Sequence, residues 1–483
     1  MGGRLAADYR RLSYCAPASM PPTLHGSRDI SWMSGANPSE KMARGTAGST
    51  IARHDGSTGA RLGPARAGDE PLEPTMHTPR FAGALSTDPD ARVAEQRCLA
   101  TLIDGLGGAA PELVVFFVTH HYGEALENLS DRLGRAMGAA TVVGCTGASV
   151  LGGRREVEQK PGLAVWAGAM PGTRVQACHI HADRDGEGVW SYTAQPDIRE
   201  PARASLLLLG DPYSFPMPEY LDLLGREHPG VPVIGGMASG GSGPGQNLLW
   251  ANGKVLRFGM VAVVIEGEVE VSTAVSQGCR PVGEPIVITR CRDNVILELR
   301  GRPAAKVLLE TAERMPESDR QLFRRAAFIG IAVDARKSVF EAGDLLVRSI
   351  VHLDLKHHAV AIADRRLRVG QTVQFMVRDA DSASADLEQL LERRAADWAP
   401  IAAGGRDTGS LLFTCGGRGS RMFPMLHHDV TCLQAAFGPD LAVAGFFANG
   451  EIGPVGGQSF LHGQSVSIAM FRLRGETGAG GPG

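Results

Sequence analysis

The stretch Leu441-Ala-Val-Ala-Gly-Phe-Phe-Ala-Asn-Gly450 starts as a short apolar run and ends in small residues and glycine. Such a run predicts a buried strand that passes directly into a tight turn. Two earlier stretches have the same character, Val142-Val-Gly-Cys-Thr-Gly-Ala-Ser149 and Val233-Ile-Gly-Gly-Met-Ala-Ser239. A strand that ends in this way is therefore a recurring unit of the chain.

Each of these turns lies in a longer segment with the same order of elements. A strand, an amphipathic stretch, the strand with the turn and a last strand follow one another in residues 113–168, 205–267 and 410–473. Strand–helix–strand series occur in any α/β protein, but the recurring small-residue turn favours internal duplication. We therefore expect an α/β fold of repeated strand-helix-strand-strand units, which form mixed sheets covered by helices.

The composition is that of an ordinary globular protein, with 43% hydrophobic residues, 21% charged residues and a net charge of −3. The sequence has no Lys/Arg cluster with interleaved aromatic residues, which argues against nucleic acid as a partner. No apolar stretch reaches the roughly 18 residues that cross a bilayer, so no membrane association is expected. The eight cysteines form no C-x-x-C pair and no zinc-finger spacing, and reduced thiols fit a cytoplasmic location.

The chain divides into four segments. Residues 1–79 lack hydrophobic periodicity and are rich in small residues, Arg and Pro, so we expect a disordered extension. A targeting segment for an organelle, or a start codon assigned too far upstream, would explain them equally well. Residues 80–268 and 269–473 are expected to form two domains, and residues 474–483 a disordered tail.

The run Gly445-Phe-Phe-Ala-Asn-Gly-Glu-Ile-Gly-Pro454 holds the most distinctive candidate residues. Its glycines and proline force irregular backbone, which can direct several N–H groups at one point. Glu451 lies inside this turn, where a charge is costly unless it has a partner. Asn449 precedes it, and His462 follows from the same end of the predicted sheet. A plain chain reversal with a solvated Glu451 remains an equal alternative.

A second run, Phe413-Thr-Cys-Gly-Gly-Arg-Gly419, leaves a buried strand straight into glycines. Arg418 offers a planar fork for a carboxylate or a phosphate, and the backbone of Gly416 to Gly419 can complete a cradle. Cys415, or Cys145 in an earlier turn, could serve as a nucleophile. Catalysis would need a lowered thiol pKa, and the sequence offers no adjacent histidine to lower it.

Three histidine doublets raise the question of a metal or haem site, at residues 120–121, 357–358 and 427–428. Adjacent residues of a strand point to opposite faces, so a doublet is a poor bidentate metal site. One member could still ligate a haem iron, but solvated polar positions explain the doublets more simply. We therefore expect no metal and no cofactor, and haem binding stays an alternative.

Together these runs resemble the FIST family, the F-box and intracellular signal transduction domain. The resemblance rests on Cys415-Gly-Gly-Arg-Gly419, on the Gly445–Pro454 run and on Leu461-His-Gly463. Weaker similarity lies in Ala84-Leu-Ser-Thr87, Val143-Gly-Cys-Thr-Gly147 and Val233-Ile-Gly-Gly236. It implies that residues 80–268 form an N-terminal FIST-like domain and residues 269–473 a C-terminal one.

The resemblance also implies a sensory module that binds a small molecule, with amino acids as a proposed ligand class and haem in some members. Residues 1–79 lack the Leu-rich helices of an F-box, so we expect signal output through a protein partner. Our first hypothesis is a non-catalytic sensor in which Arg418 binds a carboxylate and Glu451 and Asn449 bind an ammonium group. The alternatives are a haem-dependent gas or redox sensor, a cysteine-dependent enzyme and a scaffold. The ligand-binding candidates are Cys145, Cys415, Gly416, Arg418, Gly419, Asn449, Glu451 and His462.

Overall fold

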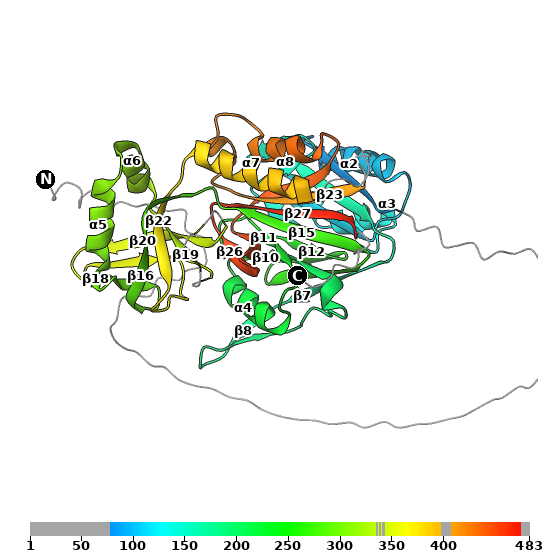
Figure 1. The fold of residues 1–483 in the computed structure, drawn as a ribbon. Helices are drawn as coiled ribbons and strands as arrows, with labels where there is room; N and C mark the ends of the chain where they lie inside the picture. The colour runs from blue at the N-terminus through cyan, green and yellow to red at the C-terminus, as the bar shows by residue number, and fades with distance from the viewer. Residues whose placement is uncertain (1–77, 335–336, 338–339, 341–342, 398–406, 475–483) are drawn as a thin grey trace, which may run out of the picture. The chain divides into compact units, whose positions relative to one another are not determined.

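The structure is a computed structural model that describes residues 78–474, apart from 335–336, 338–339, 341–342 and 398–406. The predicted N-terminal extension and C-terminal tail lie almost entirely outside these residues and stay predictions. The described residues form a mixed α/β fold in which helices cover several mixed sheets, as the sequence indicated (Figure 1). None of the described helices is long and apolar enough to span a membrane.

Three units repeat one pattern of strand pairing. In each unit two parallel strands flank a helix, and a last strand runs antiparallel to the first. The first unit consists of β2 (Leu113–Thr119), α3 (Leu129–Met137), β3 (Thr141–Gly147) and β6 (Leu163–Ala169). The second consists of β10 (Ala204–Gly210), α4 (Met217–Glu227), β11 (Val233–Met237) and β14 (Met260–Gly267). The third consists of β23 (Thr408–Cys415), α8 (His428–Phe437), β24 (Ala442–Ala448) and β27 (Val466–Leu473).

Each unit also gives a β-hairpin to another unit. The hairpins are β4–β5 (Ser149–Gly152 and Arg155–Glu158), β12–β13 (Leu249–Ala251 and Lys254–Leu256) and β25–β26 (Glu451–Val455 and Gln458–His462). The first unit's hairpin pairs with β24, the second unit's with β3 and the third unit's with β11. With the outer strands β1 (Arg80–Ser86), β7 (Thr173–Ile180) and β15 (Val269–Ser276), this cyclic exchange gives three six-stranded sheets in the described chain.

One glycine recurs at the same register position of all three units, and its role is steric. A Cβ at this position would lie only 1.9–2.5 Å from a carbonyl oxygen of the neighbouring parallel strand, far inside contact distance. The glycine and strand pairs are Gly144 with Phe116, Gly235 with Leu208, and Gly445 with Leu412. The predicted repeat therefore reflects a close approach of backbones that the fold makes three times.

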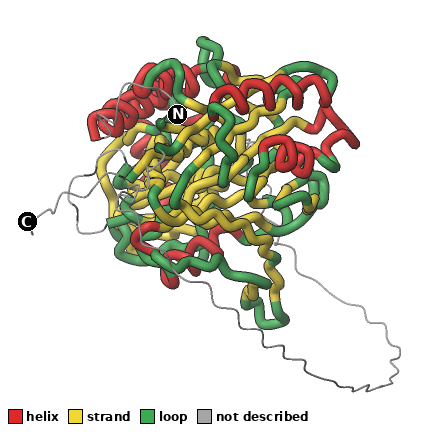
Figure 2. The backbone as a smooth tube through the Cα atoms, turned by 90° about the vertical axis from the view of Figure 1, so that its right-hand side faces the viewer, coloured by secondary structure: helices red, strands yellow, loops and turns green. Residues whose placement is uncertain are grey.

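Strands gather in the interior and helices lie over them (Figure 2). Large aromatic side chains fill the core between the sheets, where Phe117 stacks on Phe446 with ring centroids 4.9 Å apart. Helix α2 (Ala91–Leu106) begins at Asp90, whose carboxylate accepts hydrogen bonds from the next turn, and ends at a left-handed glycine. The sequence suggested one helix over residues 123–137. Gly123 instead has φ +55° and kinks a 3₁₀ turn, η2 (His120–Leu126), so that α3 begins only at Leu129.

A closed barrel lies before the third unit, between β15 and α7 (Ala380–Asp397). Its strands are β16 (Arg280–Arg292), β17 (Val295–Leu299), β19 (Phe328–Ala332), β20 (Leu345–Asp354), β21 (Ala359–Ile362) and β22 (Thr372–Val377). Strand β16 pairs with both β22 and β17, which closes the ring, and the short β18 (Arg302–Pro303) adds to β17. Helices α5 (Ala304–Arg314) and α6 (Glu317–Arg325) pack on it, and it has its own apolar core. The sequence indicated several of these elements but not the closure.

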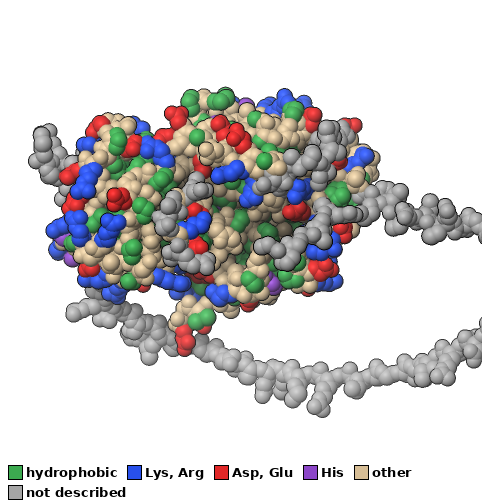
Figure 3. Space-filling view, viewed as in Figure 1, with side chains coloured by type: hydrophobic (Ala, Val, Ile, Leu, Met, Phe, Trp, Pro, Cys, Tyr) green, Lys and Arg blue, Asp and Glu red, His purple; other side chains and the backbone are tan. Residues whose placement is uncertain are grey.

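The remaining described elements are short. They are the hairpin β8–β9 (Ala182–Arg184 and Trp190–Tyr192), η3 (Pro201–Arg203) and η4 (Gly419–Arg421). On the face drawn in Figure 3, basic and acidic side chains are interspersed.

Candidate functional site

The two candidate turns leave neighbouring parallel strands at the same edge of a sheet. Cys415 is the last residue of β23 and pairs with Ala448, the last residue of β24. The Cys415 N–H donates to the Ser465 carbonyl at 2.9 Å, and the Gly416 N–H donates to the Ala448 carbonyl at 3.3 Å. Three turns therefore meet, one after β23, one after β24 and one before β27.

Arg418 is fully buried and already holds a carboxylate of the protein. Its Nε and Nη2 donate to Asp429 at 2.8 and 2.7 Å, and its guanidinium carbon lies 5.0 Å from the centre of the Phe423 ring. Burial disfavours the charge on Asp429, but Arg418 and further hydrogen bonds hold the pKa of this carboxyl well below its usual range. One donor of Arg418, Nη1, is shielded from solvent and has no hydrogen-bond partner among the described residues. The predicted clamp is thus mostly committed to Asp429.

Glu451 is also fully buried, as the first residue of β25. Its Oε2 accepts from the Ser465 N–H at 3.1 Å and from the Ser465 hydroxyl at 2.8 Å. Its Oε1 has no partner among the described residues. Burial raises the pKa of Glu451 to about 8, although the Ser465 hydrogen bonds and the charges of Arg378 and Arg418 oppose this change. At neutral pH the carboxyl group is therefore mostly protonated.

The other two hairpins show what the fold otherwise puts at this position. Glu451 faces Gly236 of β11, and the equivalent pairs are Val150 with Phe446 and Leu249 with Cys145. Val150 and Leu249 are fully buried aliphatic side chains. The third unit thus has a buried carboxyl group where the first two units have an aliphatic group.

A second comparison between the units gives the same contrast. In each unit an N–H at the end of the first strand donates to the carbonyl of the residue just before the last strand, at 2.9–3.0 Å. The pairs are Thr119 with Gly162, Asp211 with Gly259, and Cys415 with Ser465. The Gly162 N–H donates to the Thr119 hydroxyl in the first unit, and the Gly259 N–H donates to the Ser214 hydroxyl in the second. The Ser465 N–H donates to the Glu451 carboxyl group in the third. Neutral hydroxyl groups therefore do in two units what a carboxyl group does in the third.

Arg378 completes the cluster, and the sequence analysis missed it. It directly follows β22, and its Nη1 donates to the Gln464 side chain. Its Nε and Nη2 are shielded from solvent and have no partner among the described residues. The same two nitrogens of Arg418, Nε and Nη2, bind Asp429. The charge of Arg378 acts on both Glu451 and Cys415, and the charge of Arg418 acts on Arg378. These four side chains therefore lie close together.

Cys415 does not have the surroundings of a nucleophile. Burial, and after it the charge of Glu451, raise the pKa of its thiol to about 12, so the thiolate is disfavoured. Gly416 is exposed, whereas Gly419 is buried with φ +60°, and a Cβ there would lie 2.7 Å from the Glu158 carboxylate. The half-buried side-chain amide of Asn449 forms no hydrogen bond with a described residue.

The side chains of two other predicted residues form no hydrogen bond with Arg378, Arg418 or Glu451 in the described structure. Cys145 is buried in the apolar core and pairs in the sheets with Phe117 and Leu249. The ring of His462 is buried, and its Nε2 lies 2.9 Å from the Gly453 carbonyl oxygen, to which it donates. Burial, followed by the charge of Arg348, lowers the pKa of His462 to about 3. His462 nevertheless lies directly across the β25–β26 hairpin from Glu451.

The histidine doublets have separate structural settings. His120 and His121 are exposed and stack on each other, with ring centroids 4.6 Å apart. His427 accepts a hydrogen bond from the Glu156 N–H. The ring nitrogens of His428 lie 2.9 Å from an Asp429 oxygen and 2.8 Å from the Ser384 hydroxyl. Among the described residues no group of three or more His, Cys, Asp or Glu side chains is arranged to hold a metal ion.

Comparison with known proteins gives a consistent family. Residues 112–302 match the model of the FIST N domain, and residues 304–454 match that of the FIST C domain. An uncharacterized protein of Mycobacterium tuberculosis is 38% identical over 392 residues, which cover 81% of this chain and 99% of that protein. One of Mycobacterium bovis is 35% identical over 392 residues, which cover 81% of this chain and 98% of that protein. The two family models meet at residues 302–304, whereas the sequence analysis put the domain boundary just before β15.

Proposed function

This chain belongs to the FIST family, and we propose that it is a non-catalytic sensor that binds a free amino acid between Arg378, Arg418 and Glu451. FIST domains are associated with signal transduction and small-ligand sensing, and the family is generally sensory and non-catalytic. The amino-acid ligand and the site are our proposal. It revises the sequence-based hypothesis in one respect, because the carboxylate is assigned mainly to Arg378.

The observation that carries the proposal is the buried carboxyl group of Glu451. A carboxyl group without a full set of partners is costly in a protein interior, and two of the three hairpins fill the same position with Val150 and Leu249. The fold itself therefore does not require Glu451. A ligand that supplies a partner for Oε1 would offset the cost of burying it.

Arg378 supports a carboxylate as one half of the ligand. Asp429 neutralises Arg418, and Glu451 is mostly protonated at neutral pH, so no carboxylate of a described residue is in direct contact with the charge of Arg378. The other carboxylate near Arg418, Asp386, is bound by a serine hydroxyl and a backbone amide instead. Nε and Nη2 of an arginine form the parallel pair of donors that binds a carboxylate with both oxygens.

Glu451 and Asn449 support an ammonium group as the other half. An ammonium group next to Glu451 lowers the pKa of this carboxyl, because the opposite charge favours the ionised form. The two groups would then form a charge-assisted hydrogen bond inside the protein. The side-chain oxygen of Asn449, on the adjoining turn, can accept a second hydrogen bond. A zwitterion thus satisfies both sides of the cluster at once.

The exposure of the surrounding turns supports access for a small solute. Gly416 is exposed, and Gln464 and Asn449 are half-buried above the buried charges. We propose that binding is reported to a protein partner, since sensory output needs one. The seven cysteines of the described chain are all free, which supports the cytoplasm as the compartment.

Calorimetric titration of the full chain with a panel of free amino acids tests the proposal. We expect one saturable site for some members of the panel, and at least a tenfold loss of affinity in Arg378→Ala, because a charge-assisted bidentate contact is lost. Arg290→Ala is the matched control, since this arginine is exposed on the barrel and paired with Glu298. Heat signals absent across the whole panel would remove amino acids as the ligand class.

A further inference from the structure

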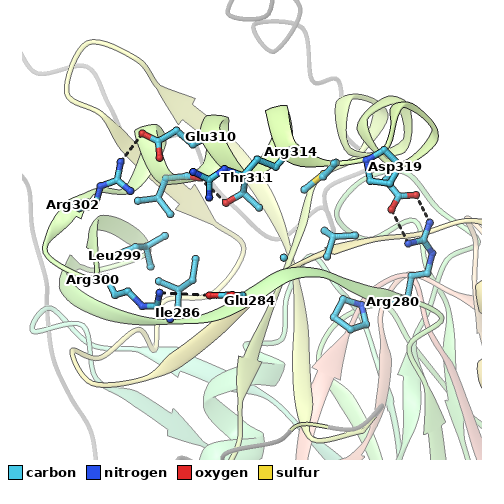
Figure 4. A pocket seen from close by; sticks show the side chains of 16 residues that line it. Arg280, Glu284, Ile286, Leu299, Arg300, Arg302, Glu310, Thr311, Arg314 and Asp319 are labelled. Atoms are coloured by element: carbon cyan, nitrogen blue, oxygen red, sulfur yellow. Dashed lines mark hydrogen bonds and ion pairs between the residues drawn. The ribbon is translucent and has the colours of Figure 1, made fainter.

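The barrel contains a cavity of about 480 Å³ that is separate from the cluster described above. It lies between β16, the end of β17, α5 and the start of α6 (Figure 4). Its floor consists of apolar side chains that the barrel buries, Val282, Ile286, Leu299, Val307 and Met315. A volume of this size, with an apolar floor and a few polar groups around it, is typical of sites for small molecules.

The strand that forms one wall is irregular at the cavity. Val282 pairs with Phe375 and Ile286 pairs with Val373, so three residues of β16 face a single residue of β22. Within this bulge Gly283 has φ +73°, and a Cβ there would lie 2.9 Å from the Thr311 methyl group of α5. Bulges of this kind are frequent next to functional sites, because they redirect the strand locally.

The rim of the cavity carries four arginines and three carboxylates. Each carboxylate has its own arginine, and the closest N–O distances are 2.5 Å for Arg280–Asp319, 2.5 Å for Arg302–Glu310 and 3.8 Å for Arg300–Glu284. Arg314 forms no ion pair with a described residue and lies, with Thr311, between the first two pairs (Figure 4). Asp379, outside the lining, is a second carboxylate at Arg280, 3.3 Å away, so Arg314 is the one lining arginine without a carboxylate partner among the described residues.

We propose that this cavity binds an amphipathic organic anion. The apolar body of the ligand would cover the five floor residues, and a single carboxylate or phosphate would lie at Arg314. Arg314, as the single arginine of the lining without a carboxylate partner among the described residues, selects a monoanion, because a more highly charged ligand would have to break the existing ion pairs. This inference does not depend on the amino-acid site, which uses other residues.

Fluorescence titration of the full chain with 8-anilinonaphthalene-1-sulfonate, an aromatic monoanion, tests the inference. We expect one saturable site per chain. Arg314→Ala should weaken binding about tenfold through loss of the charge contact, and Thr311→Phe should abolish it by filling the cavity. Arg290→Ala, on the same strand β16 but outside the lining, should leave binding of the probe unchanged. Arg378→Ala should also leave it unchanged, even if this variant no longer binds amino acids.

Competition experiments identify the anionic group that the cavity prefers. Decanoate should displace the probe if the site prefers a carboxylate, and phenyl phosphate if it prefers a phosphate. Circular dichroism checks that each variant is folded. If Thr311→Phe does not fold, the binding measured with Arg314→Ala tests the inference. Binding that does not saturate, or equal binding by the wild-type protein and the folded variants, overturns the inference.

Discussion

Raising the pH from 6.5 to 8 is expected to tighten amino-acid binding, because the ligand's ammonium group needs an ionised Glu451. Burial raises the pKa of this carboxyl to about 8 in the free protein. Below that pH the group is protonated, and binding must expel the proton. Arg378 and Arg418 keep their charge over this interval, and burial raises the pKa of the nearby thiols of Cys279 and Cys415 to about 12.

The size of the effect follows from the fraction of ionised Glu451. With a pKa of about 8, roughly 3% of the group is ionised at pH 6.5 and roughly 50% at pH 8, so the affinity should rise about 15-fold, or ~1.6 kcal/mol. Free amino acids keep their ammonium group over this range. Binding at pH 7 should release about 0.9 protons per ligand.

Calorimetry in two buffers of different ionisation enthalpy measures this proton release directly. Glu451→Gln should release none and should bind with an affinity that varies little with pH. Glu156 needs its own control, Glu156→Gln, because burial and then Asp429 raise its pKa to about 8 as well. Affinity that falls from pH 6.5 to 8 would refute the reasoning and would indicate a ligand carboxylate that accepts a hydrogen bond from protonated Glu451.

Three further predictions concern stability, measured by denaturant unfolding. Glu451→Gln should be more stable than the wild-type protein at pH 8, by on the order of 4 kcal/mol, but not at pH 4. The raised pKa of Glu451 makes the folded wild-type protein lose stability as the pH rises from about 4.5 to 8. Gly445→Ala should cost at least ~3 kcal/mol or prevent folding, since its Cβ would lie 1.9 Å from a carbonyl oxygen of β23. Its control is Gly225→Ala in α4, where a Cβ meets no atom within 4 Å, and which should be neutral or stabilising by up to ~1 kcal/mol. Asp429→Ala should cost about 3–5 kcal/mol, because it leaves Arg418 buried without its partner; a cost below ~1 kcal/mol would show that the pair is not buried as described.

The repeated units could be predicted from the sequence because their signal is local. An apolar strand that ends in glycine and small residues is readable in a short window, as at Gly144, Gly235 and Gly445. The unusual position of Glu451 was readable for the same reason, because a charge inside a glycine-rich turn after a buried strand is conspicuous.

The exchange of hairpins and the closure of the barrel could not be predicted in this way. Val150 pairs with Phe446 across almost 300 residues, and nothing near either residue encodes the partner. Arg378 was missed for the same reason, since only the return of the chain from the barrel brings it to the cluster. His462 lies directly across the β25–β26 hairpin from Glu451, whereas the side chain of Cys145 lies in the apolar core.

Replacing Glu451 by leucine tests the central claim most directly, because it gives the third hairpin the residue that the second has at the equivalent position. Amino-acid binding to the wild-type chain and to Glu451→Leu would be compared by calorimetry at pH 8, together with unfolding curves for both. We predict that Glu451→Leu still folds, because removal of the buried carboxylate at pH 8 offsets the cost of leaving the Ser465 N–H without its cap, and that it no longer binds the amino acid. A stable Glu451→Leu variant that binds the amino acid as tightly as the wild-type protein would contradict the proposed site.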